Sequence, residues 1–152
     1  MFVIVKHIVI LFIHEELSRK PIAINSSLFI LMVMEPDELC AKIAKIDPKI
    51  RFSGLINHRG RLIAGGMVTK VQSLEDEKKD EMLYMELALR VKMRQEFDAD
   101  FGHVHFSLSY REKLIVMSFP MEKDVLLVSM DKRKSFDEIP FKIVKLVQKY
   151  LS

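Results

Sequence analysis

The sequence predicts one α/β (α+β) sandwich domain, in which helices pack on an antiparallel sheet. Three observations support this prediction: apolar residues recur at helical spacing in several segments, a glycine-containing turn joins two short strands, and three later strands alternate apolar with polar residues. From Glu35 onward the expected order is helix, two strands, long helix, three strands and a final helix, or α-β-β-α-β-β-β-α.

Composition narrows the classes of function. The chain of 152 residues is long enough for one domain with its own core, and its 49% apolar and 30% charged content is typical of a globular protein. The net charge of +3 is too small to favour nucleic acid as a partner. Cys40 is the single cysteine, which excludes an internal disulfide and favours a cytoplasmic location.

Residues 1–34 form an apolar N-terminal extension ahead of the domain expected over residues 35–152. Its apolar runs, such as Phe2–Ile13, are shorter than the ~20 residues of a membrane-spanning helix, so a membrane role is not expected. Three interpretations stay open: an extension that packs on the domain or inserts at a membrane interface, a weak export or anchor signal, and a start assigned too far upstream. We favour the third, because a compact domain begins directly after Met32 and Met34.

The first helix is expected to begin at Pro36, because proline and neighbouring acidic residues suit the first turn of a helix. Leu39, Ile43 and Ile46 then recur at helical spacing, which places them on one buried face. The helix is expected to end at Asp47-Pro48, since the residue before a proline avoids the helical conformation.

A β-hairpin is expected next. In its first strand, Ile50–Ile56, strict alternation places Ile50 and Phe52 on the same face. Residues 57–60 have the composition of a hairpin turn that ends in a glycine, which adopts a positive φ without strain. Arg61–Ala64 then forms the return strand.

After a connection over residues 67–74, a long helix is expected over Glu75–Phe97. Acidic residues gather at its start and basic residues at its end, which matches the helix dipole. At 100° per residue its apolar residues form two separate stripes, whereas a sheet covers only one. The uncovered stripe is therefore expected to contact a partner. One stripe consists of Met82, Met85, Leu89, Met93 and Phe97, and the other of Leu83, Leu87 and Val91.

The last third of the chain predicts three consecutive antiparallel strands and a helix. His103–Tyr110 alternates apolar and polar residues, and Leu114–Phe119 and Asp124–Met130 follow after short polar turns. Ser135–Glu138 has the spacing of a capping box, and the apolar residues of Ile139–Tyr150 recur at helical spacing behind it.

The hairpin Gly54–Ala64 and the order of elements resemble the roadblock (dynein light chain) family. From Glu35 onward the chain is also similar to a group of small uncharacterised archaeal proteins, in stretches such as Glu81–Arg90 and Ser109–Lys113. The roadblock resemblance implies one five-stranded antiparallel sheet with helices on both faces. It also implies a non-enzymatic homodimer that pairs the long helix and the following strand across a two-fold axis, and a role as scaffold or regulator of a small GTPase or another cytosolic protein.

Two groups of residues are the candidate contacts of this module. A homodimer interface is predicted at Met82, Leu83, Leu87, Val91 and Phe106, and the turn Tyr110-Arg111-Glu112-Lys113 is a candidate recognition loop, because loops carry function more often than cores. The alternative function, from a different class, is a sensory domain of profilin-like or PAS-like layout that binds a small ligand between sheet and helix.

Several other residue groups contain side chains that can act in catalysis or binding, but a structural role explains each of them better. No third metal ligand stands near the histidine pair, no closing glutamate completes a calcium loop, and no phosphate-binding motif surrounds the glycines. We therefore expect no catalytic residue, cofactor or metal. The groups are His103 with His105, Asp98–Gly102, Gly60 with Gly65-Gly66, Cys40, the acids of Glu75–Glu81, and Lys142, Lys145 and Lys149 with Lys132-Arg133-Lys134.

Overall fold

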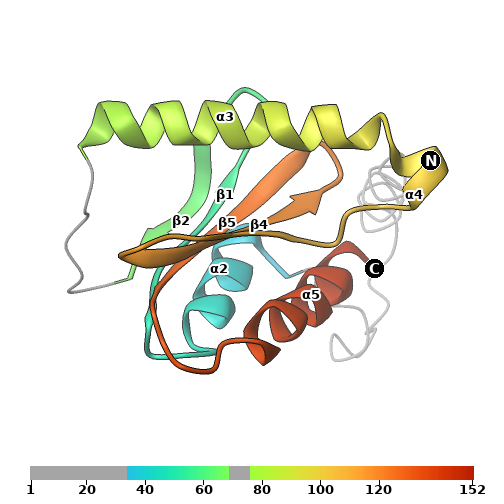
Figure 1. Ribbon diagram of the computed structural model, residues 1–152. Helices are drawn as coiled ribbons and strands as arrows, with labels where there is room; N and C mark the ends of the chain where they lie inside the picture. The colour runs from blue at the N-terminus through green and yellow to red at the C-terminus, as the bar shows by residue number, and fades with distance from the viewer. Residues whose placement is uncertain (1–33, 69–75) are drawn as a thin grey trace, which may run out of the picture. The chain divides into compact units, whose positions relative to one another are not determined.

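The computed structural model describes residues 34–68 and 76–152 (Figure 1). The chain divides into two units, Met1–Met32 and Val33–Ser152, and all described residues belong to the second. The predictions for the apolar N-terminal extension, and for most of the connection over 67–74, lie outside the described residues. The domain boundary expected at residue 35 stays a prediction.

The order of elements matches the sequence prediction, with one short helix added. The helix α4 follows the long helix directly, and the strand after it begins at Ser107 rather than at His103, because residues 103–106 carry no regular structure. In chain order the elements are α2 (Pro36–Ala44), β1 (Ile50–Ile56), β2 (Leu62–Met67), α3 (Glu77–Gln95), α4 (Asp98–Phe101), β3 (Ser107–Tyr110), β4 (Leu114–Met121), β5 (Asp124–Asp131) and α5 (Glu138–Leu151).

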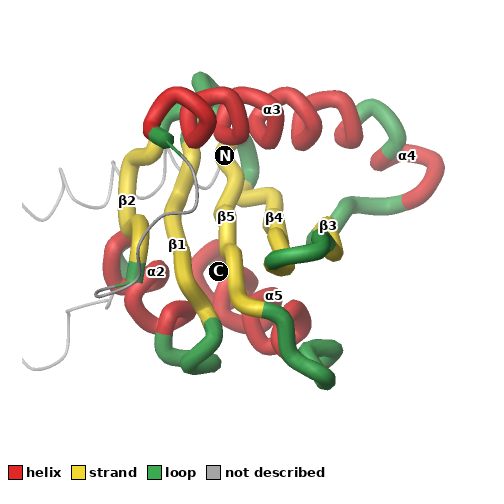
Figure 2. The backbone as a smooth tube through the Cα atoms, turned by 60° about the vertical axis from the view of Figure 1, so that its left-hand side comes forward, coloured by secondary structure: helices red, strands yellow, loops and turns green. Residues whose placement is uncertain are grey.

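The five strands form one antiparallel sheet in the order β2-β1-β5-β4-β3, which confirms the predicted fold class. Figures 1 and 2 show α3 on one face of this sheet and α2 with α5 on the other. The crossover from β2 to β3 runs through α3, so β2 and β3 become the two edges of the sheet.

Each face of the sheet has its own apolar core. The larger core lies between the sheet and the α2–α5 layer and is centred on fully buried residues such as Ile43, Phe119 and Ile143. The smaller core lies under α3. Its buried members are Phe52, Ile56, Tyr84, Leu87, Val91, Val125 and Leu127.

Strand β1 departs from the strict alternation that its sequence predicts. Ile50 belongs to the larger core, whereas Phe52 belongs to the core under α3, so these two residues do not share a face. The register of β1 against β5 shifts between them, and a shift of one residue turns the following side chains to the other face. The strand therefore supplies both cores.

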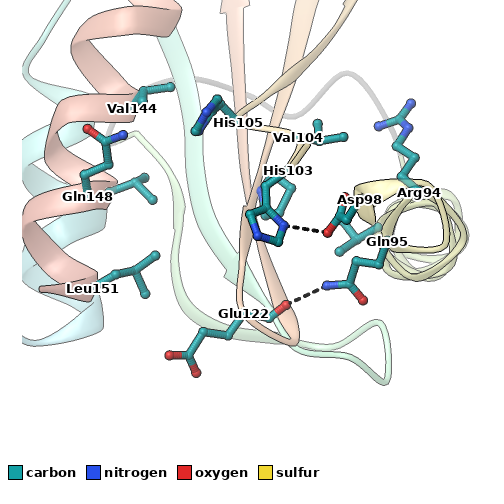
Figure 3. Close-up of a pocket in the computed structure, with 13 residues that line it drawn as sticks. Arg94, Gln95, Asp98, His103, Val104, His105, Glu122, Val144, Gln148 and Leu151 are labelled. Atoms are coloured by element: carbon teal, nitrogen blue, oxygen red, sulfur yellow. Dashed lines mark hydrogen bonds and ion pairs between the residues drawn. The ribbon is translucent and has the colours of Figure 1, made fainter. Parts of the chain in front are cut away.

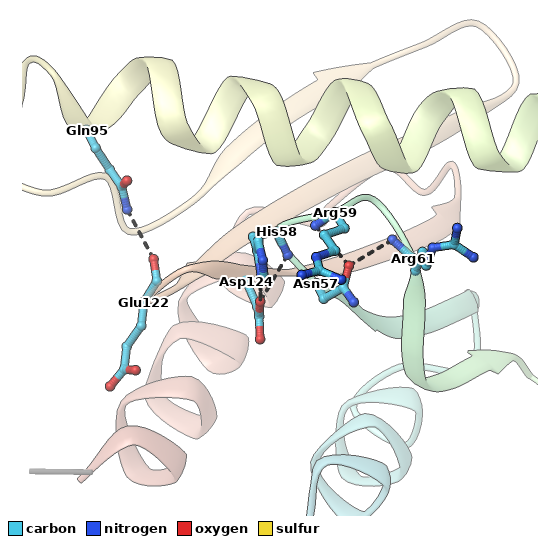
Figure 4. A network of polar contacts seen from close by, with 7 residues as sticks. All are labelled: Asn57, His58, Arg59, Arg61, Gln95, Glu122 and Asp124. Atoms are coloured by element: carbon cyan, nitrogen blue, oxygen red, sulfur yellow. Dashed lines mark hydrogen bonds and ion pairs between the residues drawn. The ribbon is translucent and has the colours of Figure 1, made fainter. Parts of the chain in front are cut away.

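The helix α3 lies across the strands at the end of the sheet that carries two of its turns. At the β1–β2 turn, Gly60 comes so close to α3 that an added Cβ would lie 2.8 Å from the Cα of Met85. At the β4–β5 turn, the side chain of Gln95 donates a hydrogen bond of 3.1 Å to the carbonyl of Glu122 (Figure 4). Both turns therefore fix α3 at this end of the sheet.

The β1–β2 turn is itself held in shape by its first residue. The side-chain oxygen of Asn57 accepts hydrogen bonds from the backbone N–H groups of Arg59 and Arg61, at 2.9 and 3.1 Å (Figure 4). Gly60 takes the predicted positive φ of 71°. The backbone N–H of His58 donates to the carboxylate of Asp124, which joins this turn to the start of β5.

The expected capping box at Ser135 does not form. The hydroxyl of Ser135 donates instead to the carboxylate of Asp137 at 2.6 Å, and α5 begins at Glu138 without a side-chain cap. Pro140 occupies the first turn of the helix, where its missing N–H costs no intrahelical hydrogen bond. The pairing of Ser135 with Asp137 explains why the capping spacing fails.

Candidate functional site

An open groove lies on the α3 face of the sheet, at the end that α3 does not cover. We call it the β4 groove; its volume is about 570 Å³. Three parts of the chain form it: the side of α3, the outer rows of the sheet, and the β3–β4 turn. Its lining residues are Arg51, Phe52, Met67, Lys79, Asp80, Leu83, Tyr84, Arg111, Glu112, Lys113, Leu114, Val116, Leu127 and Ser129.

The strand register explains the floor of this groove. Phe52 and Val116 both pair with Ser129, and Ser109 pairs with Val116, so these four residues form one row across the strands. The next row of the sheet toward α3 contains Leu127. The helix covers this row, and Leu127 is part of the core under α3. Within this row Phe52 is buried under α3, whereas Ser109, Val116 and Ser129 are only partly buried and form the open part of the floor beside the β3 edge.

The groove continues toward the β3 edge as a small polar hollow of about 70 Å³, which shares Leu83, Arg111 and Val116 with it. There the guanidinium of Arg94 donates a hydrogen bond of 2.5 Å to the hydroxyl of Ser107, which ties the end of α3 to the edge strand. Charged and hydroxyl side chains, among them Arg90, Arg94 and Ser107, therefore line this hollow beside the edge.

The structure does not place the five predicted interface residues on one surface. Leu87 and Val91 are only 7% and 5% exposed and pack on the sheet, whereas Met82 is 71% exposed on the opposite side of α3. Leu83 is partly buried and lines the β4 groove. Phe106 lies on the other face of the sheet, where its ring packs near Phe119 and Phe141.

The reason for this separation is that apolar spacing alone reveals two stripes on α3 but not which one the sheet covers. The sheet covers the Leu83–Leu87–Val91 stripe, so most of that predicted interface is part of the core. Of the five residues, Met82, Leu83 and Phe106 keep surface that another molecule can contact. The existence of a dimer interface stays a prediction.

The exposed stripe, which the predicted interface mostly left out, holds six of the twelve exposed large apolar side chains of the described chain. We call it the outer stripe, and it continues from α3 onto α4, where the rings of Phe97 and Phe101 stack at 6.1 Å. Helical spacing in the sequence had already placed five of its six members on one stripe. The outer stripe consists of Met82, Met85, Leu89, Met93, Phe97 and Phe101, each more than half exposed.

The candidate recognition loop is divided between two surfaces. Arg111, Glu112 and Lys113 line the β4 groove. Tyr110 turns toward the other face, where its ring stacks on Phe136 at 5.7 Å and the Lys132 ammonium lies 4.3 Å from the ring centroid. Only the three charged residues of the loop can therefore act together with the groove.

A second pocket, of about 300 Å³, lies between the end of α3 and α5 (Figure 3). His103 points toward α4 and pairs with Asp98 at 2.7 Å, whereas His105 lies nearer α5. Among the described residues, no three His, Cys, Asp or Glu side chains gather closely enough to hold a metal ion. Within the same residues, no helix has the length and apolar content to cross a membrane.

Two buried side chains have shifted ionisation. Burial raises the pKa of the Tyr84 phenol at the groove wall, and the carboxylate of Asp80 adds to the shift. Burial also raises the pKa of the Cys40 thiol, which is 3% exposed in the larger core. A raised pKa keeps Cys40 as the unreactive thiol, so its environment does not suit nucleophilic catalysis.

Comparison with solved structures identifies the class of fold. MglB of Myxococcus xanthus aligns with a TM-score of 0.57 at 17% identity, over 81% of this chain and 94% of that chain. The gliding protein MglB of Thermus thermophilus aligns with a TM-score of 0.58 at 13% identity, over 75% of this chain and 83% of that chain. A Roadblock/LC7 domain from Streptomyces avermitilis aligns with a TM-score of 0.57 at 11% identity, over 74% of this chain and 92% of that chain.

The fold is therefore that of the Roadblock/LC7 domains, as the hairpin and the element order implied. The chain belongs to a family of unknown function, DUF6659, which it matches over residues 31–151. A search of curated proteins finds no match to it.

Proposed function

We propose that this protein is a homodimeric, non-enzymatic regulatory module whose two copies join along the edge strand β3. One observation carries the proposal: Val116, on the floor of the β4 groove, is an apolar residue that is only partly buried, and its strand lies next to that edge strand. An exposed edge strand offers unpaired backbone groups to another chain, and the groove offers apolar surface next to them.

Symmetry explains how a second copy would fill the groove. A two-fold axis through β3, perpendicular to the sheet, pairs the two edge strands antiparallel and exchanges the two ends of the sheet. Because α3 crosses one end, the partner's α3 crosses the other end, above the β4 groove. The C-terminal part of each α3, which reaches to the β3 edge in Figure 2, then covers the open row of its partner.

Charge supports the antiparallel arrangement of the two α3 helices. Residues 76–81 hold four acidic and two basic side chains, whereas Arg90, Lys92 and Arg94 form a basic segment near the other end. Antiparallel packing brings the acidic start of one helix toward the basic end of the other, which a parallel arrangement would not do. Leu83 and Val116 form the apolar centre of this interface.

The regulatory part of the proposal comes from the roadblock resemblance, which suggests a small GTPase as the partner of the dimer. The Roadblock/LC7 fold supports a binding platform more than a catalyst, although fold alone assigns no partner. We place the protein in the cytoplasm, and its single, buried cysteine supports this location.

The mass of the full chain in solution, by light scattering after size exclusion, tests the dimer. The assembly should contain pairs of the 17.7 kDa chain. Val116→Glu, which places a charge on the groove floor, should break the β3-edge contact while far-UV circular dichroism stays unchanged. Lys145→Glu on the exposed face of α5 is the matched control. A monomeric wild type, or an assembly that Val116→Glu leaves intact, would contradict the proposal.

The GTPase part has a separate test. Small GTPases encoded in the same genome, loaded with GDP or GTP, are mixed with the purified protein, and binding and the rate of GTP hydrolysis are measured. We expect nucleotide-dependent binding to at least one of them. Failure with every GTPase, in a protein that is dimeric, would leave the dimer and remove this partner.

A small-ligand sensor is the second candidate function, and the size of the β4 groove favours it. A volume of about 570 Å³ lies within the usual range of ligand sites, and the rings of Phe52 and Tyr84 lie 6.2 Å apart in it. A compound that raises the melting temperature of the wild type, but not of Val116→Glu, would support this function. If the protein is a dimer through the groove, such compounds should instead compete with association.

A further inference from the structure

The outer stripe of α3 points directly away from the sheet. At 100° per residue, Leu89 lies about 160° around the helix from Leu87 and Val91, which are buried on the sheet. The outer stripe is therefore not the margin of the core but a second, opposite face. Its exposed fractions, from 56% for Phe97 to 84% for Phe101, show that the described part of the chain leaves most of it uncovered, although Met85 also contacts the β1–β2 turn at Gly60.

The proposed β3-edge dimer would leave this stripe exposed. A two-fold axis perpendicular to the sheet keeps both α3 helices on the same face of the joined sheets. The dimer would consequently present two outer stripes, side by side, on one surface. The stripe needs an occupant that is distinct from the β3-edge partner.

The exposed area is larger than a monomer usually tolerates. Large apolar side chains carry about 200 Å² each, so the exposed fractions of the six residues correspond to on the order of 700 Å² of apolar surface. The largest patch on a typical monomer is about 300–600 Å². Two stripes packed together would bury on the order of 1,000 Å² in total, which is the lower bound for a specific interface.

The spacing of the stripe is nearly the same in both directions from its centre. Met85 stands four residues before Leu89 and Met93 four residues after it, whereas Met82 and Phe97 stand seven before and eight after. A two-fold axis at Leu89 therefore places Met85 against the Met93 position of a second copy, and Met82 near the Phe97 position. Flexible methionines can adapt to such a self-contact.

The charges beside the stripe select the antiparallel orientation. Glu86 and Arg90 form an ion pair on one flank of the stripe, three residues before and one residue after Leu89. In an antiparallel pair this flank faces the same flank of the second copy in reverse order, so that each Glu86 approaches an Arg90. In a parallel pair this flank would instead face the opposite flank of the second copy, so Glu86 and Arg90 would not meet across the contact.

We propose that the outer stripe is a second self-association surface, which binds the outer stripe of another copy with the two α3 helices antiparallel and Leu89 at the two-fold axis. The contact is independent of the β3 edge. A chain with both interfaces forms a tetramer, because two dimers that each present two stripes on one surface can close face to face.

Light scattering of the full chain and of three variants tests this proposal and separates it from the β3-edge dimer. Leu89→Glu with Met93→Glu changes the stripe, Val116→Glu changes the groove, and the third variant combines the three substitutions; Lys145→Glu is the control. We expect a tetramer for wild type and control, a dimer for the stripe and groove variants, and a monomer for their combination. Circular dichroism confirms that each variant is folded.

The contrary outcomes are distinguishable. A wild-type dimer that the stripe variant leaves intact and the groove variant dissociates would overturn the second interface and keep the β3-edge dimer. A wild-type dimer that only the stripe variant dissociates would keep the stripe contact and overturn the edge. A monomeric wild type would overturn both, and the stripe would then belong to residues 1–33 or to another protein.

Cysteine cross-linking tests the orientation. Met85→Cys and Met93→Cys are oxidised separately and as a mixture, with Lys145→Cys as the control. The antiparallel contact predicts that cross-linked pairs form mainly in the mixture, between one chain of each variant, and at least ten-fold less in either variant alone. Cross-linking within the single variants, or none in the mixture, would overturn the antiparallel assignment.

Discussion

Two leucines of α3, two residues apart in sequence, provide a direct test of which stripe the sheet covers. Leu87 is 7% exposed in the core under α3, whereas Leu89 is 59% exposed in the outer stripe. Both are replaced by alanine, so the chemistry of the change and its position near the centre of the helix are the same. A difference between the two variants in the free energy of unfolding therefore shows which of the two leucines is buried.

The expected magnitudes follow from that burial. Leu87→Ala removes three buried carbons at about 0.8 kcal/mol each and leaves a cavity, so it should cost about 3 kcal/mol. Leu89→Ala should cost less than about 1 kcal/mol, since much of its side chain is already in water and alanine favours the helix. With an m-value of about 2 kcal/mol per molar urea, the midpoint should fall by about 1.5 M for Leu87→Ala.

The assay is urea unfolding followed by far-UV circular dichroism, at low and high protein concentration. If the outer stripe binds a second copy, Leu89→Ala should lose additional stability only at high concentration, because association stabilises the folded state by mass action. Equal losses for the two variants at low concentration, or a larger loss for Leu89→Ala, would refute the assignment of the inner and outer stripes.

Three further predictions concern single residues. Gly65→Ala should lower the free energy of unfolding by more than about 2 kcal/mol, because φ is +70° and the new Cβ would lie 2.7 Å from the Cβ of Cys40. Gly102→Ala is the control. Its φ is +80° but the space around it is open, so it should cost only about 1 kcal/mol in the same urea assay. Cys40 should react with a thiol reagent far more slowly in the native than in the unfolded protein, since burial raises its pKa and blocks access. Tyr84 should stay protonated above the pKa of a free phenol. Its contribution to the free energy of unfolding should therefore be complete below about pH 10 and be lost as the pH rises through the pKa of the folded state. In Tyr84→Phe the free energy of unfolding should fall less over the same pH range.

The fold followed from local patterns, but the site did not. Strand alternation, the turn at Gly60 and helical spacing are each decided within a few residues, and all three led to correct elements. The β4 groove depends on where α3 crosses the sheet, which contacts at Met85 and Gln95 determine. Because those contacts join residues distant in sequence, periodicity within α3 could show its two stripes but not assign them.

Two local patterns also failed, one through a distant contact and one through a neighbouring residue. Ile50 and Phe52 were expected on one face, and a register shift against β5 separates them. Ser135 was expected to cap α5, and it bonds to Asp137 instead. In each case the sequence offered a regular pattern and a competing interaction changed the outcome, with the distant strand β5 for Phe52 and with a residue two positions away for Ser135. Prediction was therefore reliable for the type of each element and weaker for the direction of particular side chains.

The two edges of the sheet differ in a way that favours β3 as the edge for association. On β2, the N–H of Gly65 already donates a hydrogen bond of 2.8 Å to the carboxylate of Asp37 on α2, so a polar group that a new strand would need is occupied. On β3, the N–H of Arg111 pairs with the carbonyl of Leu114, which by antiparallel alternation directs the N–H groups of Leu108 and Tyr110 to the open side. Within the described residues no side chain accepts from these two groups. A natural protein usually blocks an edge that must remain unpaired, and here only β2 is blocked in this way. The unblocked edge is also the one next to the partly exposed Val116 of the β4 groove, so one partner strand and one partner helix would supply both backbone pairing and apolar burial.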